Sequence, residues 1–258
     1  MHITWLEKED LIPTVLKKLE NVDIMLDIGC GIRPQRFVRP LVHICCEPFG
    51  QYVENLREKI RDEYDRTYVI LKATWADALE LFPPKSVDSV FLIDVIEHLE
   101  KEEALRLLKA TEALARRQIT VFTPLGFMPQ HHPDGEDAWG LGGGVWQEHR
   151  SGWRPEEFDD SWDVYASRVF HTIDNLGREL ETPYGALWAI KTLDKVEEEN
   201  REISSKKEKI RTMRTVVDMV IDIRLDALLD LFILLMRVLL RIKNSMFGRL
   251  AIRFLRRS

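Results

Sequence analysis

Residues 22–31, with the sequence VDIMLDIGCG, decide the fold of this chain. They begin with a short apolar run, Val22–Leu26, and end with the glycine-containing turn DIGCG at residues 27–31. A short run of this composition is typical of a buried strand in a parallel sheet. Glycines directly after a strand let the backbone turn tightly and approach a ligand closely. The stretch therefore predicts a strand that leads into a ligand-binding turn.

Short apolar runs alternate with helical patterns along the rest of the chain. Strands are expected at residues 22–26, 41–46, 68–71, 87–93, 118–122, 162–166 and 186–192, and helices at 5–20, 51–61 and 97–117. This alternation implies βαβ units and a parallel sheet that is covered on both faces. We expect an α/β fold with a doubly wound, mostly parallel, seven-stranded sheet of the Rossmann-like kind.

Charge divides the 258-residue chain into two parts. Residues 195–258 hold 15 basic and 9 acidic side chains, a net charge of +6, whereas the whole chain carries −6, so residues 1–194 carry −12. We expect one domain at residues 1–194 and a helical, amphipathic, basic C-terminal extension at residues 195–258. An acidic body argues against a nucleic-acid partner, because such binders usually present a basic face.

The cysteines and the N-terminus indicate a location in the cytoplasm. Cys30, Cys45 and Cys46 provide no disulfide framework, which fits a reducing compartment, and we expect all three to be buried as small apolar side chains. The N-terminus lacks the pattern of a signal peptide, and no apolar run is long enough to span a membrane.

An acid marks the end of the second expected strand. Glu47 follows that strand and lies 18 residues after Gly29. A carboxylate at this place can accept hydrogen bonds from the hydroxyls of a ribose. A dinucleotide-binding turn would need a third glycine where Pro34 stands, so a nicotinamide-dependent oxidoreductase is disfavoured but stays open. A tight turn without a ligand is the other alternative.

The ordered set of motifs resembles a known family. Leu26–Gly31 is similar to motif I of the class I S-adenosylmethionine-dependent methyltransferases, and Glu47, Trp75–Leu79 and Asp94–Leu99 follow in the order of that family, as in its small-molecule, type 11-like branch. The resemblance covers roughly residues 20–125 and extends more weakly to about 193. It implies that the chain is an enzyme with S-adenosylmethionine as its cofactor.

The resemblance also implies roles for individual residues. The cofactor site would consist of Asp27, Gly29, Gly31, Glu47, Asp77, Asp94 and Val95. Glu47 would hold the ribose hydroxyls, Asp77 would face the adenine amino group, and Asp94 and Val95 would form the floor. A solvated or helix-capping acid is the alternative for Asp77. The chain departs from the family at Arg33-Pro34, where many members have another glycine.

Histidines are the candidates for catalysis, because a hydroxyl acceptor needs a general base with a pKa near the working pH. His98 follows the fourth strand, and His149 lies in a Gly-, Pro-, His- and Trp-rich loop at residues 123–153 that is typical of a functional lid. For both, a packing role is the alternative. Trp139, Trp146 and Trp153 would wall an apolar or sugar-binding face.

No metal ion is expected from the remaining histidines. The pair His131-His132 has neighbouring acids, but the spacing matches no common metal motif, so we interpret this segment as a solvated loop. His2, His43 and His171 fall outside every motif and are interpreted as structural.

The C-terminal extension predicts a contact surface. Seven basic residues and no acids lie between Arg237 and Arg257, interleaved with large apolar residues. Such a pattern is typical of a helix on an anionic membrane surface, here the inner face of a membrane, and a homo-oligomer is the alternative.

The sequence as a whole predicts a methyltransferase that acts on a small or lipid-linked acceptor, with a sugar hydroxyl as the candidate group. A non-catalytic scaffold of the same fold, whose C-terminal helices bind a membrane or a partner, is the alternative.

Overall fold

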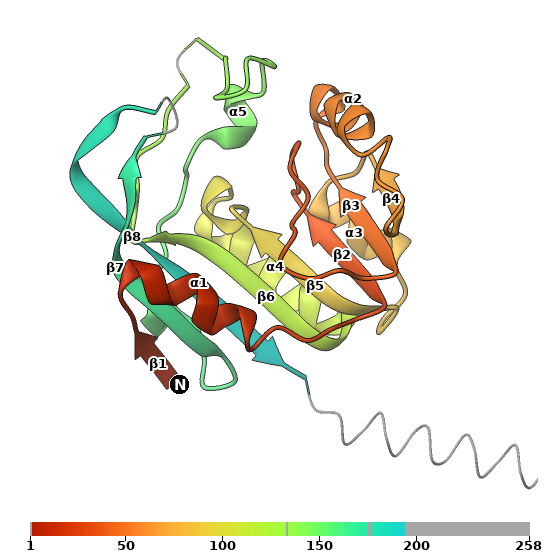
Figure 1. The fold of residues 1–258 in the computed structure, drawn as a ribbon, viewed down its shortest axis with the longest axis horizontal. Helices are drawn as coiled ribbons and strands as arrows, with labels where there is room; N and C mark the ends of the chain where they lie inside the picture. Colours follow the sequence, from red (N-terminus) through yellow and green to blue (C-terminus); the bar gives the residue numbers. More distant parts are fainter. Residues whose placement is uncertain (1, 133, 175–176, 194–258) are drawn as a thin grey trace, which may run out of the picture. The chain divides into compact units, whose positions relative to one another are not determined.

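The computed structural model describes residues 2–132, 134–174 and 177–193, which form a mixed sheet of eight strands with helices on both faces (Figure 1). The order of the strands across the sheet is β1-β7-β8-β6-β5-β2-β3-β4. Their bounds are β1 His2–Trp5, β2 Ile24–Ile28, β3 Val42–Cys46, β4 Thr67–Leu71, β5 Val87–Ile93, β6 Ala115–Leu125, β7 Asp163–Ile173 and β8 Glu179–Thr192.

Helices cover both faces of the sheet. They are α1 Lys8–Leu16, α2 Gly50–Lys59, α3 Trp75–Leu81, α4 Lys101–Leu114 and α5 Gly144–Gln147, with single 3-10 turns η1 Ile96–His98 and η2 Pro155–Glu157. On one face, Leu11 of α1 is buried in a cluster with Trp188 of β8. On the other face, Leu107 of α4 is buried with Val90 and Ile119, so the strands are apolar on both sides.

The winding of the chain reverses beside β2. β2 pairs in parallel with β3 on one side and with β5 on the other, so the chain builds one half of the sheet and then crosses to build the second half. In a doubly wound sheet, ligands bind outside the carboxyl ends of the strands at this switch point. Near the other edge, β8 runs antiparallel to both β6 and β7.

These observations confirm the expected α/β fold and its doubly wound, mostly parallel sheet, with two corrections. The sheet has eight strands instead of seven, because the first residues of the chain form β1, which pairs in parallel with β7. The expected helix at residues 5–20 begins only at Lys8 and ends at Leu16. Isoleucine, threonine and tryptophan at positions 3–5 favour a strand, and the open edge of β7 supplies its partner.

The β2–β3 connection carries no helix. Residues 29–41 form turns and bends, and Gln35 holds them in place. The backbone N–H of Gln35 donates to Asp27 Oδ2 at 2.9 Å, and its side-chain oxygen accepts from the N–H groups of Phe37 and Val38. The glycine turn is therefore not followed by the N-terminus of a helix.

The first unit of the chain ends at Asp194, and the expected extension at residues 195–258 lies outside the described residues. Its helices, its membrane contact and the domain boundary stay predictions. Across the described residues, every helix is too short or too polar to cross a membrane.

Candidate active site

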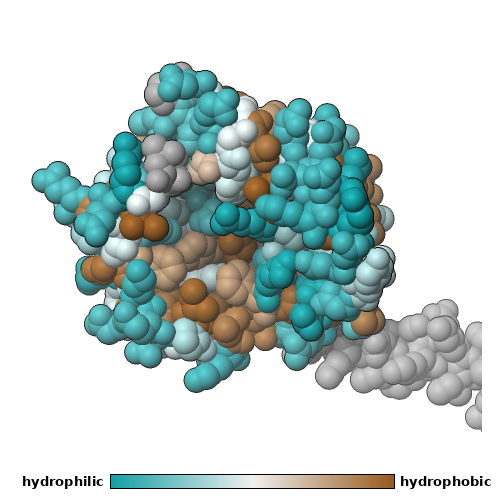
Figure 2. Space-filling view, turned by 45° about the horizontal axis from the view of Figure 1, so that its top comes forward, coloured by the Kyte–Doolittle hydropathy of each residue, from teal (hydrophilic) through white to brown (hydrophobic). Residues whose placement is uncertain are grey.

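A cavity of about 980 Å³ opens at the carboxyl ends of β2, β3 and β5, where the winding reverses. Figure 2 turns this edge of the molecule forward and shows the hollow, with apolar residues on one side and a hydrophilic rim. The glycine turn, Glu47 and residues 93–95 form one part of the lining, and the loop from Met128 to Arg150 forms the opposite part. Its volume is within the usual range for a small-molecule site, about 300–1,000 Å³.

Two glycines shape the turn that borders the cavity. Gly29 and Gly31 both have a positive φ, +69° and +55°, which side chains other than glycine rarely adopt. A Cβ atom on Gly29 would lie 2.8 Å from Val95, and one on Gly31 would lie 2.9 Å from Trp139. The turn therefore needs glycine both for its backbone conformation and for close packing against the floor and the wall of the cavity.

Glu47 lies at the carboxyl end of β3 and is 4% exposed. Its Oε2 accepts from the backbone N–H of Gly31, and its Oε1 accepts from that of Phe49, both at 2.9 Å. Burial raises the pKa of this carboxyl to about 7, although the two N–H donors act in the opposite direction. Each oxygen keeps a second lone pair, so the carboxylate can still accept hydrogen bonds from hydroxyls of a ligand.

Asp27 lies beneath the glycine turn, and its carboxylate is bound by other residues of the protein. It is 1% exposed, and its Oδ2 accepts from His43 Nε2 at 3.0 Å and from the N–H of Gln35. Burial disfavours the charged imidazole of His43, yet the hydrogen bond to Asp27 and the nearby thiol of Cys45 raise its pKa to about 9. Asp27 thus fixes the shape of the loop, and His43 is its buried partner. The three cysteines are buried and free, as expected.

Two acidic side chains meet on the floor of the cavity. Asp94 follows β5 with a φ of +52°, an uncommon conformation for a residue other than glycine, and it is open to the cavity. Glu97 is 2% exposed, and its Oε2 accepts from Thr123 Oγ1 at 2.9 Å. Although Asp94 borders the cavity, the protein around it removes much of its hydration and raises its pKa to about 6. Burial together with the charge of Asp94 raises the pKa of Glu97 well above its usual value.

His98 and His149 lie side by side at the same end of the cavity, although 51 positions separate them in the sequence. Their rings are 5.0 Å apart between centroids. His98 Nδ1 lies 3.0 Å from the carbonyl oxygen of Glu148, and His149 Nδ1 lies 2.6 Å from that of Met128. A carbonyl only accepts, so each Nδ1 carries the proton and each Nε2 carries a lone pair. Burial lowers the pKa of both imidazoles, that of His98 to about 4, which keeps them neutral at pH 7.

The backbone of Glu97 holds the two histidines together. Its carbonyl oxygen accepts from the N–H groups of Arg150 at 2.7 Å and of Ser151 at 3.1 Å. The hydroxyl of Ser151 donates to the carbonyl of Ile96 at 3.0 Å. The segment that carries His149 is therefore fastened to the 3-10 turn that carries His98.

The expected lid, residues 123–153, forms a wall of the cavity around a buried aspartate. Asp137 accepts from the hydroxyl of Tyr52 at 2.6 Å and from three backbone N–H groups, those of Trp139, Leu141 and Gly143. Trp139 and Trp146 line the cavity as expected. Trp153 does not, because its ring is completely buried in the core and its N–H donates to Ser151.

Asp77 does not line the cavity. It is the third residue of α3, where its carboxylate accepts from the backbone N–H of Thr74 at 2.8 Å, while the Thr74 hydroxyl accepts from the N–H of Asp77. This reciprocal pair is a capping box. Thr74, Trp75 and Ala76 line the cavity in its place, so the adenine contact of Asp77 stays a prediction beside an observed capping role.

Acidic groups outnumber basic ones around the cavity. Its lining includes the acids Asp27, Glu47, Asp94, Glu97, Glu103 and Asp174, against the bases Arg33 and Arg150. The histidines add little positive charge, since the pKa values of His98, His149 and His171 are all lowered. The cavity therefore favours a ligand that carries positive charge near this floor.

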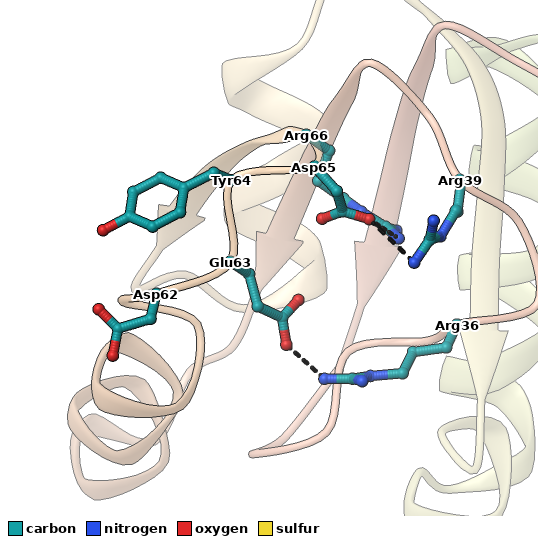
Figure 3. A pocket seen from close by; sticks show the side chains of 7 residues that line it. All are labelled: Arg36, Arg39, Asp62, Glu63, Tyr64, Asp65 and Arg66. Carbon is teal, nitrogen blue, oxygen red and sulfur yellow. Dashed lines mark hydrogen bonds and ion pairs between the residues drawn. The ribbon is translucent and has the colours of Figure 1, made fainter.

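A second pocket, of about 420 Å³, lies between the β2–β3 connection and the turn before β4 (Figure 3). Its arginines are already paired, Arg36 with Glu63, and both Arg39 and Arg66 with Asp65. Such pairing leaves little positive charge for an anionic ligand.

Glu97, Tyr52 and His171 are among the cavity residues that the sequence did not predict. Glu97 lies within the Asp94–Leu99 motif, and its spacing of three positions from Asp94 could have placed both acids on one turn. Tyr52 and His171 line the cavity from α2 and β7. Neither has a local signal in the sequence, because packing between distant segments brings them there.

No protein-family model matches the chain, and no curated protein matches it. Solved structures do match. An S-adenosylmethionine-dependent methyltransferase from Archaeoglobus fulgidus is 16% identical, with a TM-score of 0.43, covering 72% of this chain and 95% of that one. Magnesium protoporphyrin IX methyltransferase from Synechocystis with bound S-adenosylmethionine is 14% identical, with a TM-score of 0.42, covering 71% and 79%. TehB from Haemophilus influenzae is 12% identical, with a TM-score of 0.47, covering 70% and 61%.

Proposed function

We propose that the protein is an S-adenosylmethionine-dependent methyltransferase. The observation that carries this proposal is the pairing of Gly31 with Glu47: a glycine turn and a carboxylate meet at the switch point of a doubly wound sheet, with no helix N-terminus behind them. Glycine turns and strand-end acids suit a nucleoside, and a helix N-terminus is what a pyrophosphate requires. S-adenosylmethionine has a nucleoside and no phosphate.

The charge of the cavity supports the same choice. S-adenosylmethionine carries a positive sulfonium, and the carboxylate of Asp94 places negative charge on the floor beside Val95. A nicotinamide dinucleotide would bring two phosphate charges into the same acidic surroundings. The oxidoreductase alternative is therefore disfavoured by both the loop and the charge.

The residues of the chain suggest how the cofactor would be held. Glu47 would accept from the ribose hydroxyls, and Gly29 would let the cofactor approach the floor at Val95. The bound cofactor would supply an electrophilic methyl group that passes from its sulfur to the acceptor atom as the acceptor gives up a proton. The neutral Nε2 of His98 or His149 would accept that proton, since each Nδ1–H is held by a backbone carbonyl.

The acceptor proposal is a small or lipid-linked molecule with a sugar hydroxyl as the methylated group. Trp139 and Trp146 on the cavity wall support it, because aromatic faces suit the apolar faces of sugars. The contact of the C-terminal extension with a membrane surface, from the basic pattern of residues 237–257, is proposed on sequence alone.

The direct test is calorimetric titration of the full-length protein with S-adenosylhomocysteine and, in parallel, with NADH. Saturable 1:1 binding of S-adenosylhomocysteine alone is the expected result. Binding of NADH alone would overturn the cofactor proposal in favour of the oxidoreductase. Binding of neither would favour the scaffold alternative.

A further inference from the structure

Glu97 has a buried carboxylate oxygen that the protein itself leaves without a hydrogen bond. Its Oε2 is bound by Thr123, but among the described residues no donor reaches Oε1. The neighbouring group is the carboxyl of Asp94, which repels a second negative charge and accepts a hydrogen bond from Glu97 only when Glu97 is protonated. A buried acceptor of this kind is unfavourable unless a proton or a cation occupies the gap.

Two imidazoles lie close to the carboxyl group of Glu97. One possible ligand atom from each of Glu97, His98 and His149 lies within 4.8 Å of the others. Each histidine has its Nδ1–H fixed on a backbone carbonyl, which leaves Nε2 as its free electron pair. Metal-binding histidines have this arrangement, because the hydrogen bond on one nitrogen fixes the tautomer and aims the other nitrogen at the ion.

We propose that Glu97, His98 and His149 form a binding site for a divalent transition-metal ion at the floor of the cavity. Two imidazoles with one carboxylate suit ions such as Zn²⁺, Fe²⁺ or Mn²⁺, and three protein ligands leave coordination positions open. Ligands about 2.1 Å from a tetrahedral ion lie about 3.4 Å from one another, so small side-chain rotations close the set. The expectation from sequence that the chain holds no metal considered only His131 and His132.

The open positions define a class of acceptor. They face the cavity, where an oxygen of the acceptor can bind the ion beside the proposed methyl donor. A hydroxyl bound to a divalent ion loses its proton more easily than a free one. In the metal-loaded protein this effect replaces a free imidazole as the means of removing the proton, because both Nε2 lone pairs then bind the ion. This part rests on the proposed function, whereas the metal site itself does not.

The test uses metal-free full-length protein titrated with Co²⁺, followed by its visible absorption, and with Zn²⁺, followed by calorimetry. We expect saturable 1:1 binding. Glu97→Gln and His149→Gln should each weaken it roughly tenfold or more, as removal of ligand support does elsewhere. His131→Gln is the matched control, because His131 is an exposed histidine of the same loop. Equal affinity in all four proteins would overturn the proposal.

Two further readouts keep the test decisive. The amide of Glu97→Gln can donate to Asp94, so this variant should unfold at the same or a higher temperature while losing the metal. If either variant is unfolded, His98→Gln is used instead. If the wild-type protein does not bind Co²⁺, that result alone overturns the proposal. S-adenosylhomocysteine is titrated in a separate experiment. If the protein binds the metal but not S-adenosylhomocysteine, only the proposed function is overturned. If it binds S-adenosylhomocysteine but not the metal, only the metal site is overturned.

The acceptor part has its own probe. Acetohydroxamate, a small ligand with two oxygen donors, should shift the spectrum of the Co²⁺-loaded protein, because it occupies open positions. An unchanged spectrum at saturating acetohydroxamate would show that the protein closes the coordination sphere and would overturn the acceptor role.

Discussion

The backbone N–H of Gly31 donates a hydrogen bond of 2.9 Å to the carboxylate of Glu47, sixteen positions further along the chain. This bond joins the turn after β2 to the end of β3, and it fixes the two features that any nucleoside in the cavity would meet.

Glu47→Gln should weaken the binding of S-adenosylhomocysteine by roughly tenfold or more. The substitution turns one carboxylate oxygen into an NH₂ group, which cannot accept from a ribose hydroxyl and leaves the N–H of Gly31 or Phe49 without its acceptor. Each hydrogen bond lost from a ligand hydroxyl to this group costs about 1–3 kcal/mol. Calorimetry measures the effect. Glu54→Gln, on the exposed face of α2, is the control and should bind as the wild type does. Unchanged affinity in a folded Glu47→Gln protein would refute the ribose assignment.

The affinity for S-adenosylhomocysteine should rise with pH. Burial raises the pKa of Glu47 to about 7, so in the free protein much of this carboxyl is protonated at pH 6 and ionised at pH 8. A ligand whose hydroxyls prefer the carboxylate then binds up to about tenfold more tightly at pH 8. The dependence should disappear in Glu47→Gln, and a slope that persists in this variant would assign it to another group.

The same shift has a consequence for stability, with the opposite sign. The pKa of Glu47 is higher in the folded protein than in the unfolded chain, so the folded state binds more protons between about pH 4.5 and 7. Its contribution to the free energy of unfolding therefore falls as pH rises through this window. Urea unfolding of the wild type and of Glu47→Gln at pH 5 and pH 8 measures this contribution. The free energy of unfolding of the wild type, relative to that of Glu47→Gln, should be lower at pH 8 than at pH 5.

Gly29→Ala should abolish the binding of S-adenosylhomocysteine, while it should lower the free energy of unfolding only modestly. The added Cβ would lie 2.8 Å from Val95 at the floor of the site. Gly177→Ala is the matched control, because Gly177 also has a positive φ, +78°, but an added Cβ there would have no atom within 4 Å. Both variants carry the backbone strain of about 1 kcal/mol. Only Gly29→Ala should lose affinity, and Val95→Ala should restore part of it in the double variant.

Asp77→Ala separates the two roles considered for this acid. Because its carboxylate completes the capping box of α3, we expect a lower unfolding temperature and less than about a threefold change in affinity for S-adenosylhomocysteine. Thr74→Ala removes the other half of the box and should lower the free energy of unfolding by about 1 kcal/mol. A loss of affinity in Asp77→Ala that matches Glu47→Gln would instead support the adenine contact.

Removal of residues 237–258 should reduce sedimentation with anionic liposomes. This segment holds seven basic residues and no acids, interleaved with apolar ones. Neutral liposomes are the control, and both proteins should bind them weakly. Equal sedimentation of the two proteins with anionic liposomes would favour the homo-oligomer alternative, which gel filtration of the same pair tests.

The sequence determined those features that depend on local pattern. Alternation of apolar runs with helical spacing predicted the doubly wound sheet, and the strand Val87–Ile93 was predicted at its observed bounds. The glycine turn and Glu47 were predicted to lie near each other, because each follows a strand and parallel strands place their carboxyl ends at one edge of the sheet. The edge strand His2–Trp5 was missed, since four residues carry too little pattern, and only the free edge of β7 makes them a strand.

Tertiary structure alone decided the chemistry of the cavity. His98 and His149 were each visible as candidates, but their contact depends on the hydrogen bonds from Arg150 and Ser151 to the backbone of Glu97. The unpaired oxygen of Glu97 and the caps on both Nδ1 atoms arise from groups far apart in the chain. Local sequence fixes which residues end a strand, whereas burial and hydrogen bonding between distant segments fix which atoms remain free to act.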